Sequence, residues 1–151
     1  MAAPRGDRPS LVPVNLMEKI CFKYIPMAGG ASYGAMCINM MQPSVFKSIY
    51  GSWEVAATHG CWLKAHIGVG LYLYSRNVMK QADMYHRIAY SVFGSVIFNF
   101  GSVLLWGYSK LILPDNTAVR VIFGLSTAVA LVAVGMDYIK FVDSKVGNKL
   151  E

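Results

Sequence analysis

Charged residues are scarce in this sequence, at 15% of its 151 residues against about 25% in a typical soluble domain. Hydrophobic residues make up 55%, and the mean hydropathy is +0.42. The net charge is +6, but no run of basic residues interleaved with aromatic residues occurs, which argues against a nucleic-acid partner. The length suggests one domain. This composition therefore indicates an integral membrane protein.

Motifs of catalytic or metal-binding chemistry are also lacking. The three cysteines, Cys21, Cys37 and Cys61, have no metal-ligand spacing, and each lies in or beside an apolar segment, so we interpret them as buried free thiols. The sequence contains no phosphate-binding loop, no HExxH motif and no Ser-His-Asp arrangement. We expect no metal site, and we favour a protein without catalytic activity of its own.

Four apolar segments are long enough to form membrane helices: residues 25–41, 53–75, 88–113 and 119–141. They predict an all-α fold, an integral membrane four-helix bundle that occupies residues 25–141. Residues 1–24 form a polar N-terminus whose last part, 14–24, has the pattern of a short amphipathic helix in the interface plane. A helical extension of the first span is the alternative. We expect a polar loop at 42–52 and a polar tail at 142–151.

The second of these segments carries four ionisable residues, Glu54, His59, Lys64 and His66. Lys64 and His66 fall near its middle, where insertion scales put the cost of a Lys at roughly 3 kcal/mol. Such a helix does not suit lipid on all sides. We therefore expect another protein, a cofactor or water to shield it, and we assign Glu54 and Lys64 as interaction residues.

His59 and His66 are the candidates for a cofactor site. They are seven residues apart and share one face of a helix, so they cannot ligate one haem from opposite sides. His86 falls at the start of the third span, which is too shallow for the second ligand. A haem or quinone shared with another subunit is one hypothesis, and a proton path along the second span is another. Pairing of these groups with a partner subunit or a bound phospholipid is the interpretation we prefer.

Small residues predict where helices approach one another. Gly30 and Gly34 form a GxxxG pair in the first span, and Gly94 and Gly101 lie seven apart in the third. Asn99, near the centre of the third span, predicts an interhelical hydrogen bond worth about 0.6–2 kcal/mol. We assign these five residues to interactions between helices.

Basic residues predict the orientation of the four spans. An even number of spans places both chain ends on one side, and the basic residues gather there. That side carries Arg5, Arg8, Lys19, Lys23, Arg76, Lys80, Arg87, Lys140, Lys145 and Lys149. The opposite side carries Lys47, Lys110 and Arg120. Because loops on the cytoplasmic or matrix side are rich in Lys and Arg, both termini are predicted to lie there.

These features favour a small accessory subunit of a larger membrane complex, with other membrane subunits and lipids as partners. A lone four-span bundle leaves little room for a substrate cavity. The basic N-terminus, which we expect to be kept, the free cysteines and the short loops favour the mitochondrial inner membrane and a respiratory-chain or ATP-synthase complex. Two alternatives stay open. One is an endoplasmic-reticulum four-span scaffold or lipid-pathway helper with cytoplasmic termini; the other is a small transporter or a haem- or quinone-binding protein that uses the second span.

Overall fold

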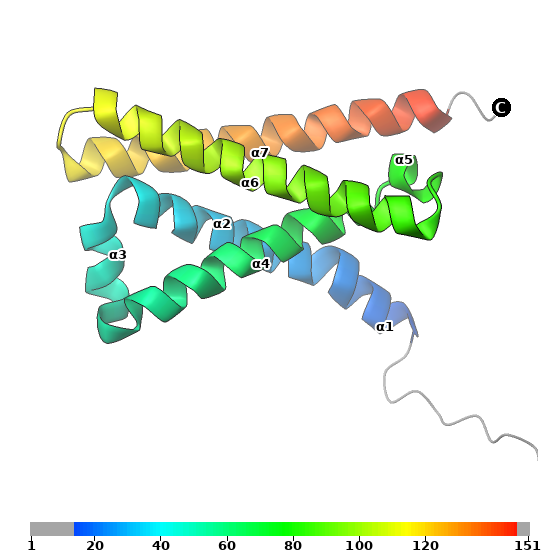
Figure 1. Cartoon of the computed structure of the whole chain (residues 1–151), viewed down its shortest axis with the longest axis horizontal. Helices are drawn as coiled ribbons and strands as arrows, with labels where there is room; N and C mark the ends of the chain where they lie inside the picture. The colour runs from blue at the N-terminus through cyan, green and yellow to red at the C-terminus, as the bar shows by residue number, and fades with distance from the viewer. Residues whose placement is uncertain (1–13, 148–151) are drawn as a thin grey trace, which may run out of the picture.

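The computed structural model describes residues 14–147, which form helices joined by short connections, with no β-strand among them (Figure 1). This confirms the predicted all-α class. In chain order the elements are α1 (Val14–Lys19), the π-helical turn η1 (Ile20–Tyr24), α2 (Ile25–Met41), α3 (Pro43–Tyr50), the 3₁₀ turn η2 (Gly51–Trp53), α4 (Glu54–Tyr74), α5 (Asn77–Lys80), α6 (Met84–Ile112) and α7 (Thr117–Gly147).

Two of these helices are long and apolar enough to cross a membrane, namely α6 and the part of α7 from Thr117 to Val146. They coincide with the third and fourth predicted spans. The other two predicted spans are also helical, as α2 and α4, but neither passes the same test of length and composition. The helical positions are thus as predicted, and the four-span arrangement stays a prediction.

Three boundaries differ from the prediction. Residues 14–41 form one continuous helical segment, because η1 joins α1 to α2 through residues with αR backbone. The predicted amphipathic helix is therefore an extension of the first span. The loop predicted at 42–52 contains α3, which begins at a proline and buries Phe46. Helix α7 continues to Gly147, into the segment predicted as a polar tail from residue 142; residues 1–13 and 148–151 lie outside the described part of the chain.

Local hydrogen bonds set the connections between these helices. α3 ends at Tyr50, and the next residue, Gly51, has a φ of +54° in the region that L side chains rarely adopt. Asp83 caps α6 by accepting from the backbone N–H of His86 at 3.4 Å, and its hydrogen bond with the His86 side chain holds the pKa of Asp83 below its usual value. The Asp143 carboxylate accepts from the Val78 N–H at 2.8 Å. This bond joins α5 to the C-terminal part of α7.

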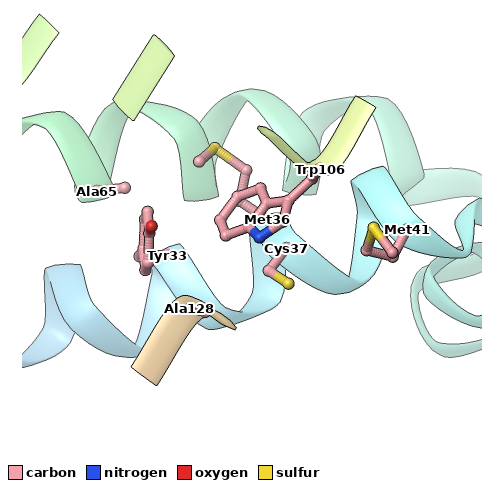
Figure 2. Close-up of a cluster of buried hydrophobic side chains, with 7 residues drawn as sticks. All are labelled: Tyr33, Met36, Cys37, Met41, Ala65, Trp106 and Ala128. Atoms are coloured by element: carbon pink, nitrogen blue, oxygen red, sulfur yellow. The ribbon is translucent and has the colours of Figure 1, made fainter. Parts of the chain in front are cut away.

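The core is built around α2, which contacts α4, α6 and α7. One face of α2 and a single residue from each of the other three helices form the buried cluster (Figure 2): Tyr33, Met36, Cys37, Met41, Ala65, Trp106 and Ala128. The polar groups of its two aromatic side chains both form hydrogen bonds. The Tyr33 hydroxyl donates to Ser102 Oγ at 2.7 Å, and Trp106 Nε1 donates to Thr127 Oγ1 at 3.1 Å.

The closest approach between helices lies where α2 crosses α4. A Cβ atom on Gly29 would lie 2.6 Å from the Cα of Gly68, and one on Gly68 would lie 2.7 Å from the Cα of Gly29. Both positions therefore need glycine, as at the small-residue interfaces of membrane helices. The predicted pair, Gly30 and Gly34, does not pack against another helix of residues 14–147, because no atom of those helices lies within 4 Å of a Cβ at either position. The crossing uses the neighbouring glycine instead.

Gly29→Ala is expected to destabilise the protein by about 1–3 kcal/mol, because the added methyl meets backbone that cannot move aside without parting the helices. Gly30→Ala is the matched control on the next residue, and alanine there should be neutral or stabilising by up to about 1 kcal/mol. Unfolding of both purified variants by SDS titration in mild micelles, followed by circular dichroism, measures the difference. Equal stabilities would show that the crossing is not tight.

Candidate functional site

The polarity of α6 is reversed relative to a helix of a water-soluble protein. Its buried positions are mostly small and polar: Ser91, Ser95, Asn99, Ser102, Trp106 and Ser109. Its exposed positions include large apolar residues such as Phe93, Leu104 and Leu111, with 64%, 72% and 82% of each residue exposed. A soluble helix turns its apolar face inward. The outer face of α6 is therefore suited to lipid or to another apolar surface, and its inner face to hydrogen bonds.

A groove lies between α4 and α6, with a volume of about 410 Å³. This volume falls within the range of about 300–1,000 Å³ typical of small-molecule sites. The lining from α4 includes His66, Ile67, Gly70 and Leu71, and the lining from α6 includes Ser91, Val92, Ser95 and Val96. The two helices are close at Gly70, where an added Cβ would be in van der Waals contact with the Ser95 Cβ at 3.8 Å.

His66 lines this groove together with one other titratable residue, Tyr74. Its Nδ1 lies 2.9 Å from the carbonyl oxygen of Trp62. Because a carbonyl only accepts, Nδ1 carries the proton in the neutral ring, and Nε2 is left as an acceptor. Nε2 is buried and has no hydrogen-bond partner among the described residues. The rings of Trp62 and Phe100 cover the imidazole, with centroids 4.1 and 6.0 Å away.

A polar chain on α6 supports the backbone of His66. Ser95 Oγ donates to the His66 carbonyl at 2.7 Å, which links α6 to α4. The Asn99 side-chain amide donates to the Ser95 carbonyl at 2.8 Å, one turn back in the same helix, and its Oδ1 is buried without a partner. The interhelical bond predicted for Asn99 is therefore made by Ser95, because the amide reaches the preceding turn before it reaches another helix.

The other polar residues predicted on α4 do not join the groove. His59 is exposed, with its Nδ1 2.7 Å from the Val55 carbonyl oxygen. Lys64 is exposed, and Glu54 is half-buried. Neither belongs to an ion pair of residues 14–147, where the recorded pairs are His86–Asp83 and Arg120–Asp115. The structure thus separates His66 from His59, although the two histidines share a helix face as predicted.

The predicted packing glycines behave differently from one another. Gly94 makes room for Leu73 of α4, since a Cβ there would be 2.7 Å from the Leu73 Cδ1. Gly101 faces open space, as Gly30 and Gly34 do. Sequence analysis missed the pairing of Gly29 with Gly68, which no spacing along the chain encodes. Close packing at Ser91 and Ser95 could be predicted from the sequence, because small residues four apart on a membrane helix favour it.

Comparison with protein-family models, with curated proteins and with solved structures found no match for this chain. Among the residues that the structure describes, no group of His, Cys, Asp and Glu side chains could hold a metal ion. The geometry offers an apolar groove with one unused hydrogen-bond acceptor at His66. This arrangement suits the binding of a molecule and shows no nucleophile beside a general base.

Ser95→Ala is expected to destabilise the α4–α6 contact by about 0.6 kcal/mol, the average for a hydrogen bond between membrane helices, and by no more than about 1.7 kcal/mol. Ser91→Ala is the control in the same groove, because the Ser91 hydroxyl donates to the Arg87 carbonyl of its own helix. Unfolding in micelles should show a loss for Ser95→Ala that exceeds the loss for Ser91→Ala. The reverse order would contradict the interhelical bond.

Proposed function

We propose that this chain is a small accessory subunit of a larger membrane complex, with α2, α4, α6 and α7 crossing the bilayer. The exposed apolar surface supports the membrane location. Large apolar residues are exposed along both apolar helices, for example Leu111 at 82% and Val129 at 69%. Soluble monomers rarely expose contiguous apolar patches above a few hundred Å². A bilayer covers such a surface without cost.

The positions of the basic residues support one orientation. α1, α5 and the C-terminal end of α7 lie at one end of the molecule, and α3 and the α6–α7 connection lie at the other (Figure 1). The first end carries Lys19, Lys23, Arg76, Lys80, Arg87, Lys140 and Lys145; the second carries Lys47, Lys110 and Arg120. On the second end, Arg120 is paired with Asp115 at 2.7 Å. This asymmetry favours both termini on the matrix or cytoplasmic side.

The single observation that carries the proposal is the exposed Lys64 at the middle of α4. Its side chain lies on the surface, outside the groove, and makes no ion pair with any described residue. Unpaired ammonium groups at bilayer depth are costly, and such residues normally face protein or water. We infer that a partner subunit covers this face and supplies an anionic or hydrogen-bonding group to Lys64.

The mitochondrial inner membrane is the proposed location, in a respiratory-chain or ATP-synthase complex. Support comes from the basic end of the bundle and from the free cysteines Cys21, Cys37 and Cys61. The groove favours one alternative, a membrane protein that binds an apolar ligand through the second span. For haem, the lining residues include no second histidine, methionine or cysteine, so a partner would have to provide the other axial ligand.

Lys64→Leu should weaken assembly by roughly 2–5 kcal/mol, because the partner's group is then left buried and unpaired. Extraction in mild detergent followed by native-mass measurement should find the wild-type chain, of 16.6 kDa, in a much larger particle. The Lys64→Leu variant should be absent from that particle. It should still resist carbonate extraction, as a protein inserted in the membrane does. Lys47→Leu, on the exposed face of α3, is the control and should assemble normally. A wild-type chain that migrates alone would overturn the proposal.

A further inference from the structure

We propose that the groove between α4 and α6 binds an apolar molecule that carries a hydroxyl group, which donates a hydrogen bond to His66 Nε2. This inference is independent of the subunit role. The Trp62 carbonyl, 2.9 Å from Nδ1, fixes the tautomer in which Nε2 is the acceptor. A buried acceptor without a partner is unfavourable, because burial removes the water that would otherwise bond to it. His66 lines the groove, so a donor bound there can reach Nε2 once a covering ring, Trp62 or Phe100, moves aside.

The chemistry of the lining selects an alcohol over other head groups. No Lys or Arg lines the groove, so a carboxylate or a phosphate would be desolvated without a counter-charge. A ketone or an ester offers only acceptors, and these would face the lone pair of Nε2. A hydroxyl supplies the missing donor and stays neutral. The apolar side chains of Ile67, Leu71, Val92 and Val96 then contact the body of the molecule.

Access to Nε2 depends on the two rings that cover the imidazole. Trp62 is 39% exposed and Phe100 is 47% exposed. Surface side chains change rotamer within nanoseconds, so neither ring closes the site permanently. His59 offers a contrast on the same helix face. It makes the same bond to the carbonyl four residues back, at 2.7 Å, but it lies on the surface outside the groove.

The test uses two photoactivatable probes that differ only at the head group, a long-chain alcohol and its methyl ether. Purified protein in lipid nanodiscs is labelled over a range of probe concentrations, and modified peptides are measured by mass spectrometry. The alcohol should label α4 and α6 at a roughly two- to tenfold lower concentration than the ether, the advantage expected from one hydrogen bond. His66→Phe should abolish this difference, and His59→Phe should preserve it. Equal labelling of the wild type by both probes would overturn the proposal.

A second pair of variants separates loss of the site from loss of the fold. Val92→Trp fills the groove from a surface position, since Val92 is 56% exposed, and should abolish labelling by both probes. Phe93→Trp, at an exposed residue outside the groove lining, should label as the wild type does. Competition with unlabelled cholesterol and with a short-chain quinol distinguishes a sterol from a hydroquinone as the natural alcohol. Failure of both to compete would count against the site.

Discussion

The contact of the α2 backbone with the α4 backbone at Gly29 and Gly68 holds together the helix pair against which α6 and α7 pack. With a Cβ-to-Cα distance of only 2.6 Å available there, the two helices meet at closer range than any side chain would allow. Ala65, one turn before Gly68 on α4, is thereby fully buried against the α2 face that carries Tyr33. Trp106, whose ring centroid lies 5.1 Å from that of Tyr33, and Ala128 complete the same cluster (Figure 2). A separation of these two helices by even one methyl group would open the core from its centre.

The distribution of polar groups gives this bundle a different source of stability from that of a soluble protein. Between membrane helices there is little hydrophobic driving force, so packing and hydrogen bonds hold them together. The inner face of α6 provides both, since its small serines permit close approach and their hydroxyls bond to Tyr33 or to the His66 carbonyl. The apolar outer faces of α6 and α7 add nothing to the core. They are the part of the molecule on which the proposed membrane location depends.

Helix α4 presents two kinds of polar surface on opposite sides. His66 faces α6 and the groove, with its free acceptor buried. Lys64 is two residues away, which places it about 200° around the helix, and it is exposed. A ligand at His66 and a partner at Lys64 therefore occupy separate surfaces of one helix. The proposed site for an apolar alcohol and the proposed partner surface therefore do not overlap.

The sequence by itself determined the helical class, the positions of the four long helices and the shared face of His59 and His66. These follow from hydrophobic runs and from the repeat of the α-helix, which are local properties. It did not determine that Gly29, and not the predicted Gly30, packs at the helix crossing. It also did not determine that Ser95 makes the interhelical hydrogen bond predicted for Asn99, or that Lys64 and His59 are exposed. Those outcomes depend on the rotation of each helix about its axis and on which helix lies beside it. Only tertiary packing decides these, because a shift of one residue along a helix turns a side chain by about 100°.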